Sequence, residues 1–195
     1  MPREMYDQDC EMTLELASDK RERPMPHVAY NSGENEWYTP SEIMSKVHRV
    51  LGGIDLDHAS TFEANEIVKA KRFFTAEQDG LKQQWRGRVF MNPPYAKPLI
   101  QYFCEKLVWH VRNGDVQEAI ALVNNATETR WFQQFRLAAS AICFPAVRIR
   151  FWQPDGEGIT VARPLQGQAV VYFGSRDNRF EDVFAELGMI VHVKK

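Results

Sequence analysis

The chain has 195 residues, of which 44% are hydrophobic and 26% are charged, and its formal net charge is −2. This length and composition are ordinary for a soluble globular protein, and we expect one domain with a buried core. No apolar stretch is long enough to span a membrane, and the acidic N-terminus is unlike a signal peptide. The three cysteines are widely spaced and show no metal-site pattern, so we expect them to be reduced, in a cytoplasmic protein. Two of them, Cys104 and Cys143, lie in apolar runs and are expected in the core.

A net charge of −2 does not by itself indicate a nucleic-acid binder, but the charges are unevenly distributed. The chain carries seven acidic and four basic residues up to Arg23, whereas residues 128–174 carry five arginines against three acids. A modest basic face on a neutral protein can bind a phosphate backbone, with strong salt dependence. Arginines scattered over a solvated surface explain the same counts equally well.

The first 30 residues are polar, charged and interrupted by Pro24 and Pro26. We therefore expect a flexible N-terminal arm over residues 1–30 and a single domain over residues 31–195. Near the start of that domain, Thr39-Pro40-Ser41-Glu42 is typical of a helix start, with the threonine as N-cap and the proline at the first helical position. Apolar residues then recur at helical spacing until Gly52-Gly53, and a short strand over residues 54–57 is predicted to follow.

Further along, strands alternate with helices, which predicts a three-layer α/β domain with a mostly parallel sheet. Its central strand is the continuous apolar run 119–123, as expected for a strand covered on both faces. Residues 61–84 are polar and weakly periodic, and residues 154–168 are predicted to form a long loop. Strands are predicted over 88–91, 119–123, 141–144, 169–173 and 189–193, and helices after Tyr95, over 129–139 and over 180–187.

The run Asn92-Pro93-Pro94-Tyr95 directly follows the apolar residues 89–91, at the end of a predicted strand. Open α/β sheets bind ligands at the carboxyl ends of their strands. The two prolines stiffen the backbone and lack an N–H, so carbonyl oxygens there are free to accept hydrogen bonds, as is the amide oxygen of Asn92. Two acceptors beside a flat aromatic ring suit the exocyclic amino group of a planar base. A proline-stiffened strand exit with a surface tyrosine explains the run, taken alone, equally well.

Two further segments are expected to meet this run if the strands are parallel and adjacent. Residues 55–60 (Asp-Leu-Asp-His-Ala-Ser) follow a strand, and an acidic side chain there suits the ammonium or ribose hydroxyl groups of a cofactor. Residues 36–40 lie at a helix start, where free N–H groups suit a carboxylate. S-adenosylmethionine carries all of these groups. There is a structural alternative to cofactor contact for each residue. Asp55 and Asp57 then only make the strand end soluble and form the turn, and Thr39 only caps the helix.

Several segments form a specific combination in this order and at short spacing: residues 36–40 (Glu-Trp-Tyr-Thr-Pro), 51–57 (Leu-Gly-Gly-Ile-Asp-Leu-Asp), 79–81 (Asp-Gly-Leu), Trp85, 87–95 (Gly-Arg-Val-Phe-Met-Asn-Pro-Pro-Tyr) and 127–132 (Thr-Glu-Thr-Arg-Trp-Phe). Through these segments the chain resembles the phage-type DNA N6-adenine methyltransferase (Dam) family from about Asn35 to Gly174. The resemblance implies a Rossmann-like class I methyltransferase fold that uses S-adenosyl-L-methionine and no metal, with adenine in DNA as the substrate. One segment departs from the family pattern, because His58 stands where Asp-Pro-Ala-Ser would have a proline. We expect this histidine to face solvent, and contact with the cofactor is the alternative.

The resemblance also implies a mechanism, in which the target adenine flips out of the duplex and stacks on Tyr95. Its N6 amino group donates hydrogen bonds to the Asn92 side chain and the Pro93 carbonyl, and the methyl group is transferred in line from the sulfonium. The implied catalytic residues are Asn92, Pro93, Pro94 and Tyr95. We expect the cofactor to contact Trp37, Thr39, Pro40, Asp55, Asp57, Ala59, Asp79 and Asn92. The charge distribution suggests Arg130, Arg148 and Arg150 for DNA phosphates, and Trp131 is a candidate wedge into DNA.

Only 34 residues separate Asp57 from Asn92, so target recognition is expected within residues 125–168, with a short target or relaxed specificity. The expected partner is double-stranded DNA in a bacterial or phage-infected cytoplasm, and the protein is expected to be a monomer or a homodimer. The structural alternative to cofactor binding by Asp79 is a turn residue, and the alternative to DNA binding by Trp131 is a core residue. Two rival functions stay open: methylation of RNA adenine or a protein glutamine, and a catalytically silent DNA-binding protein on the same fold.

Overall fold

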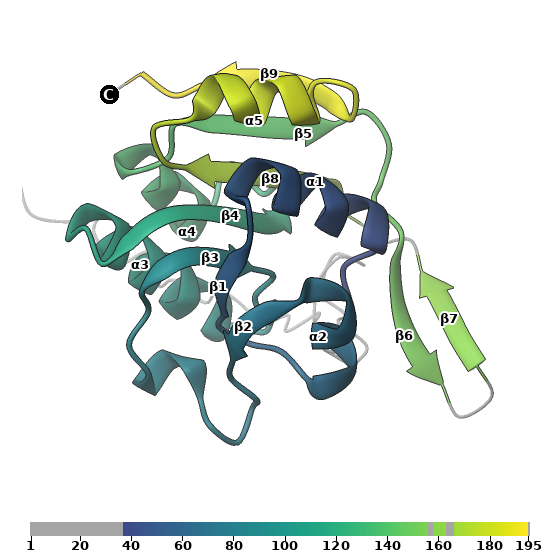
Figure 1. Cartoon of the computed structure of the whole chain (residues 1–195). Helices are drawn as coiled ribbons and strands as arrows, with labels where there is room; N and C mark the ends of the chain where they lie inside the picture. The colour runs from purple at the N-terminus through teal and green to yellow at the C-terminus, as the bar shows by residue number, and fades with distance from the viewer. Residues whose placement is uncertain (1–36, 156–157, 163–165, 195) are drawn as a thin grey trace, which may run out of the picture.

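The computed structural model describes residues 37–155, 158–162 and 166–194, so the expected arm over residues 1–30 lies outside it. Its centre is a seven-stranded sheet with the order β2-β1-β3-β4-β8-β5-β9 (Figure 1). The strands are β1 (Ile54–Asp57), β2 (Ala70–Phe73), β3 (Gly87–Met91), β4 (Val116–Asn124), β5 (Ala141–Pro145), β8 (Gln168–Phe173) and β9 (Gly188–His192).

Helices cover both faces of this sheet, as Figure 1 shows. Alternate residues of β4 point to opposite faces: Ala121 packs in a core cluster with α3 and α4, and Leu122 packs in a second cluster with α1 and α5. No helix in the part of the chain that the structure describes is long and apolar enough to cross a membrane. The helices are α1 (Ser41–Leu51), α2 (Phe62–Val68), α3 (Leu99–Arg112), α4 (Arg130–Gln134) and α5 (Asp177–Phe184), with short 3-10 turns η2 (Gly80–Lys82) and η3 (Phe135–Leu137).

The expected α/β class is confirmed, but the expectation of a mostly parallel sheet is wrong for half of the sheet. Strands β2, β1, β3 and β4 pair in parallel, whereas β8 pairs antiparallel with both β4 and β5, and β9 pairs antiparallel with β5. The physical reason is the connection from β5 to β8, whose described residues form no helix. A parallel neighbour needs a crossover connection, whereas an antiparallel neighbour does not.

These pairings give β1, β3, β4 and β5 a common direction, so all four strands end at one edge of the sheet. We call this the carboxyl edge. The run that begins at Asn92 follows β3 there, and residues 58–60 follow β1. The edge therefore gathers segments that are far apart in the sequence.

Two regions that were predicted to be irregular contain regular elements. Residues 61–84 form α2, β2 and η2, which are so short that their apolar periodicity is weak. Part of the predicted loop over 154–168 belongs to a β-hairpin made of β6 (Phe151–Asp155) and β7 (Gly158–Ala162). This hairpin forms its own two-stranded sheet and projects beside the main body of the protein (Figure 1). Proline and glycine residues conceal its strand pattern in the sequence.

The boundaries of α1 also differ slightly from the prediction. Pro40, and not Thr39, is the N-cap residue, and no side chain caps the first turn. The predicted end is confirmed: Gly52 adopts a left-handed conformation with φ of 72°, and its N–H donates to the carbonyl of His48.

Candidate active site

The side-chain amide of Asn92 lies where β3 leaves the sheet. Its Nδ2 donates a hydrogen bond to the carbonyl oxygen of Trp37, at 3.0 Å. Its Oδ1 is buried and has no hydrogen-bond partner among the residues that the structure describes. Buried amide oxygens are nearly always hydrogen-bonded, so this acceptor is open to a group other than the described residues. The bond to Trp37 also sets the orientation of the amide, because an inverted amide would place two oxygens together.

The residues that follow Asn92 are held against the core. Pro93 is buried and Pro94 is half-buried. The Tyr95 hydroxyl donates to the carbonyl of Leu122 on β4, at 3.2 Å, and the half-buried ring packs against the core cluster beneath α3. Burial raises the pKa of Tyr95, so its hydroxyl stays protonated as a donor. The ring is thus fixed in place, which a stacking platform requires.

A buried carboxylate lies beside this segment, at the end of β1. Asp57 is 3% exposed and pairs in register with Phe90, two residues before Asn92 on the neighbouring strand. Its Oδ1 accepts from the N–H of Ala59 at 3.3 Å, and Oδ2 has no hydrogen-bond partner within the described ranges. The structure therefore brings Asp57, Ala59 and Asn92 together at the carboxyl edge, as predicted from the strand order.

His58 does not face solvent, and the prediction that it replaces a proline on the surface is wrong. Its side chain is fully buried, in edge-to-face contact with Trp85 and Phe103 at 4.8 and 4.6 Å between ring centroids. The Nδ1 atom lies 3.5 Å from Asp57 Oδ1. Burial lowers the pKa of His58, so the ring is neutral near pH 7. The aromatic pocket formed by the distant Trp85 and Phe103 explains the burial, and nothing adjacent to His58 in the sequence indicates it.

Sequence reasoning also missed Ser60. Its Oγ is buried without a hydrogen-bond partner among the described residues, and its N–H donates to the carbonyl of Phe74, at 2.9 Å. The segment after β2 is thereby tied to the segment after β1. Together with Asn92 Oδ1 and Asp57 Oδ2, the Ser60 hydroxyl gives this edge several polar atoms that have no partner among the residues described. In the sequence, the position of Ser60 three residues after Asp57 was the feature that could have identified it.

The residues that lead into α1 contact Asn92 through Trp37. Trp37 is half-buried and its carbonyl accepts from Asn92 Nδ2, and Thr39 is 4% exposed. The Thr39 carbonyl accepts from Trp152 Nε1 at 3.3 Å, and the Pro40 carbonyl accepts from the N–H groups of Ile43 and Met44 in α1. The structure thus joins Trp37 directly to the Asn92 amide, and Thr39 and Pro40 follow Trp37 closely in the chain.

Asp55, in contrast, is engaged elsewhere. Its carboxylate forms ion pairs with Arg88 at 2.9 Å and with Lys71 at 2.9 Å. These cations hold the pKa of Asp55 well below its usual range. Asp55 precedes the Leu56–Val89 pair, so it lies toward the start of β3 and away from Asn92. The structure does not bring Asp55 to the other candidate residues.

Asp79 has a structural position in a tight turn. It adopts a left-handed backbone conformation, with φ of 52°, and its Oδ1 accepts from the N–H of Leu81, at 3.1 Å. Its Oδ2 pairs with Lys82 at 3.1 Å. The next residue, Gly80, packs so tightly that a Cβ atom there would lie 1.9 Å from the His58 carbonyl oxygen. Asp79 therefore sits on a turn that presses against the exit of β1.

The residues predicted to bind DNA follow strands that end at the carboxyl edge. Arg130 is exposed at the start of α4, after β4, and Arg148 and Arg150 are exposed between β5 and β6. Trp131 is half-buried against the core, in edge-to-face contact with Phe132 at 5.7 Å. The arginines are therefore available to solvent and to DNA phosphates, whereas much of the Trp131 ring is used in packing.

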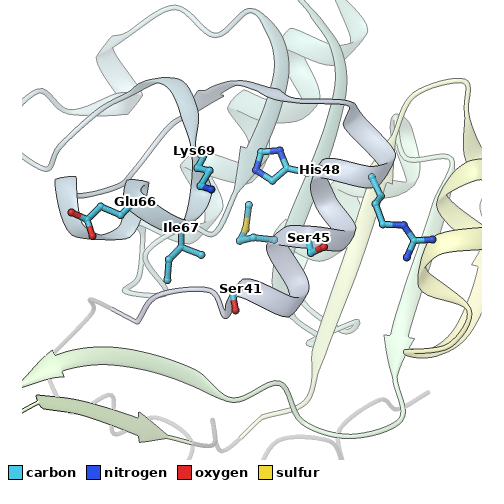
Figure 2. A pocket seen from close by; sticks show the side chains of 8 residues that line it. Ser41, Ser45, His48, Glu66, Ile67 and Lys69 are labelled. Atoms are coloured by element: carbon cyan, nitrogen blue, oxygen red, sulfur yellow. The ribbon is translucent and has the colours of Figure 1, made fainter.

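A groove of about 630 Å³ between α1 and α2 lies apart from Asn92 and Asp57, neither of which lines it (Figure 2). Its lining comprises Ser41, Met44, Ser45, His48, Arg49, Glu66, Ile67 and Lys69. Both predicted core cysteines are buried thiols, as expected. Burial raises the pKa of Cys104, and raises that of Cys143 to about 11, so neither is a ready nucleophile at neutral pH.

Similarity to known proteins identifies the family of the chain. Residues 29–180 match the family model described as DNA N-6-adenine-methyltransferase (Dam). The chain is also similar to the DNA N-6-adenine-methyltransferase of Haemophilus phage HP1 (strain HP1c1), with 30% identity over 105 residues. That alignment covers 52% of this chain and 56% of the phage protein, so the chain spans about half the length of this curated relative. The match of the family model over most of the chain shows that the protein belongs to the DNA N-6-adenine-methyltransferase (Dam) family.

Proposed function

We propose that the protein transfers a methyl group from S-adenosyl-L-methionine to N6 of an adenine in DNA. The observation that carries this proposal is the state of the Asn92 amide. Its nitrogen is held by the Trp37 carbonyl, while its oxygen is buried without a partner among the described residues. An amino group that donates to this oxygen would satisfy it, and the adenine N6 is such a group.

The chemistry follows from where the acceptors lie. Asn92 Oδ1 and the Pro93 carbonyl accept the two N6 hydrogens, which favours a pyramidal nitrogen whose lone pair is withdrawn from the purine ring. These hydrogen bonds strengthen as N6 attacks the methyl carbon and the carbon–sulfur bond breaks, so they stabilise the transition state more than the ground state. The N6 proton becomes acidic on methylation and leaves to solvent, so no strong base is required.

The donor side of the site is assigned to the residues after β1 and before α1. The carboxylate of Asp57 suits the ammonium or ribose hydroxyl groups of S-adenosyl-L-methionine, and the Ser60 hydroxyl offers a further hydrogen bond. Trp37, whose carbonyl holds the Asn92 amide, and the neighbouring Thr39 and Pro40 complete the proposed site. Asp55 is left out of this set because Arg88 and Lys71 already satisfy its carboxylate. Asp79 is proposed to hold the turn that shapes the site.

The parallel half of the sheet, with its ligand residues at the carboxyl edge, supports a Rossmann-like methyltransferase fold within a single domain over residues 31–195. Double-stranded DNA would bind across residues 125–168, with Arg130, Arg148 and Arg150 at its phosphates. The adenine must leave the duplex to reach Asn92, and Tyr95 would stack on it. The proposed substrate places the enzyme in the cytoplasm of a bacterial or phage-infected cell.

The test is methyl transfer by the wild-type protein and by Asn92→Ala. Radiolabelled S-adenosyl-L-methionine is incubated with DNA, RNA or protein, and the label in each is counted. We expect label in DNA as N6-methyladenine, and a loss of about 100- to 1000-fold in Asn92→Ala, as for removal of one transition-state hydrogen bond. Asn113→Ala, at an exposed position after α3, is the matched control.

Cofactor binding is measured in parallel by calorimetry, and should survive in Asn92→Ala. Label in RNA or protein but not in DNA would reject adenine in DNA as the substrate. Full turnover by Asn92→Ala would reject the assigned role of the amide. A wild-type protein that binds DNA but not S-adenosyl-L-methionine would instead identify a catalytically silent DNA-binding protein.

A further inference from the structure

One peptide group connects Asn92 to the β6–β7 hairpin. The peptide between Trp37 and Tyr38 is hydrogen-bonded on both sides: its carbonyl accepts from Asn92 Nδ2 at 3.0 Å, and its N–H donates to the Trp152 carbonyl at 2.8 Å. A peptide group is planar, so its C=O and N–H move together. Any rotation that weakens the bond to Trp152 therefore also displaces the acceptor that orients the Asn92 amide.

Trp152 holds this peptide through several contacts. Its N–H donates to the Tyr38 carbonyl at 3.2 Å, which completes an antiparallel bridge between the two residues. Its indole Nε1 donates to the Thr39 carbonyl at 3.3 Å. The rings of Tyr38 and Trp152 meet edge to face, with centroids 4.9 Å apart. The segment 37–39 thus takes its position from Trp152 as well as from α1.

Trp152 lies at the base of the hairpin. The preceding residue, Phe151, is 5% exposed and belongs to the core cluster beneath α1, so the hairpin is anchored at that point. Beyond Trp152, the two strands pair only with each other and project beside the main body (Figure 1). A two-stranded ribbon has the dimensions of the major groove of duplex DNA. The exposed Arg148 and Arg150 lead into it, where phosphates would flank an inserted ribbon.

We propose that Trp152 is a positioning residue, which couples duplex DNA bound at the β6–β7 hairpin to the orientation of the Asn92 amide. This inference rests on the proposed function, because it concerns the acceptor that would bind N6. In this arrangement the hairpin keeps the Trp37 carbonyl in place, and that carbonyl keeps Asn92 Oδ1 directed into the site. Movement of the hairpin on DNA is transmitted through a single peptide plane to the acceptor.

Trp152→Phe tests the coupling with a small change, because phenylalanine retains an aromatic ring beside Tyr38 while the indole N–H donor is lost with the second ring. Loss of one such hydrogen bond corresponds to about a three- to tenfold effect on rate. We expect the single-turnover rate of methyl transfer to fall by that factor, with the affinity for S-adenosyl-L-methionine unchanged. Trp109→Phe is the matched control, since Trp109 is 58% exposed on α3.

A double-mutant cycle with Asn92→Ala distinguishes positioning from general damage. If Trp152 acts through the amide, Trp152→Phe should have no further effect on the residual rate of the Asn92→Ala protein. An equal loss of rate in both backgrounds would overturn the proposal. Trp152→Ala extends the series, and its thermal unfolding reports whether the fold survives.

A measurement independent of activity separates this inference from the proposed function. The side-chain amide signal of Asn92 in a ¹⁵N–¹H spectrum is identified by its absence in Asn92→Ala. Trp152→Phe should shift this signal, whereas Trp109→Phe should not, and added duplex DNA should shift it in the wild type. If neither Trp152→Phe nor added DNA shifts the Asn92 signal, the coupling is overturned, even if the enzyme methylates DNA. If the signal responds but no DNA is methylated, the proposed function fails and the link between Trp152 and Asn92 stands.

Discussion

The carboxylate of Asp55 and the guanidinium of Arg88 face each other in a two-pronged contact between β1 and β3. Nε donates to Oδ2 at 2.9 Å and Nη2 donates to Oδ1 at 3.1 Å, while the Arg88 backbone N–H also donates to Oδ2. Arg88 Nη1 further donates to the carbonyl of Leu51, at the end of α1. This pair joins two strands and a helix at the edge of the sheet opposite Asn92, so its role is to support the fold.

We therefore predict that Asp55→Asn lowers the free energy of unfolding at pH 7 by about 1–2 kcal/mol, a value reduced for the partial exposure of both side chains. Because Arg88 depresses the pKa of Asp55, the stabilisation is complete above the unfolded pKa near 4 and is lost as the pH falls further. Chemical denaturation between pH 2 and pH 7 should show a smaller acid loss in Asp55→Asn. Asp182→Asn, exposed on α5, should leave the curve unchanged.

Substitutions of the two aspartates of β1 should differ in their effect on cofactor affinity. We predict that Asp57→Ala weakens the binding of S-adenosyl-L-methionine by about tenfold or more, because a buried charged hydrogen bond is lost. Asp55→Ala should leave the affinity nearly unchanged while lowering stability. Isothermal titration calorimetry on both variants makes the comparison, and a greater loss of affinity in Asp55→Ala would contradict the assignment of Asp57.

His58 should make the protein sensitive to mild acid. Burial lowers the pKa of this histidine, so the unfolded chain binds its proton more readily than the folded protein does. Stability is then complete above the unfolded pKa of about 6.5 and falls as the pH drops below it. We predict that His58→Met loses less stability than the wild type between pH 6.5 and pH 5, as measured by thermal unfolding.

His192 provides a control of opposite sign. Its pKa is raised by Glu181 and Asp177, so its contribution is present below the unfolded pKa and is lost as the pH rises. His192→Gln should therefore steepen the loss of stability on acidification, where His58→Met reduces it. Identical pH curves for His58→Met and the wild type would show that the buried imidazole does not govern the response.

The exposed arginines after β5 should contribute to DNA binding through charge. We predict that Arg150→Ala weakens binding to different DNA sequences by a similar factor and lowers the slope of log K against log salt concentration by about 1. Fluorescence anisotropy at several salt concentrations measures both quantities. Arg112→Ala, at the exposed end of α3, removes the same charge and should leave the slope unchanged.

Long apolar runs made much of the fold predictable. The central strand β4 and the helix α3 bury enough aliphatic side chains to show their periodicity in the sequence. Shorter elements were not predictable in this way, because α2 buries only Ala64 and Val68 among its seven residues. The direction of β8 depends on which strands it lies between, and local sequence does not encode that placement.

The candidate site was likewise predictable only in part. Asn92 and Asp57 were predicted because Asn92 follows a strand, and Asp57 ends one, at the same edge of the sheet. Asp55 differs from Asp57 through its ion pairs with Arg88 and Lys71, and Arg88 lies 33 residues away, so composition and spacing alone cannot separate the two acids. The orientation of the Asn92 amide is set by a carbonyl 55 residues earlier, and no local pattern signals such a contact.

The β6–β7 hairpin occupies the chain between β5 and β8, and those two strands pair directly with each other in the large sheet. Its outer part can therefore be exchanged, lengthened or shortened without changing the register of any strand that supports the site. A graft from a related enzyme would have to retain Phe151 and Trp152, where the ribbon is rooted. Within that limit, the architecture allows the outer part of the hairpin to vary while the residues of the proposed methyl-transfer site stay the same.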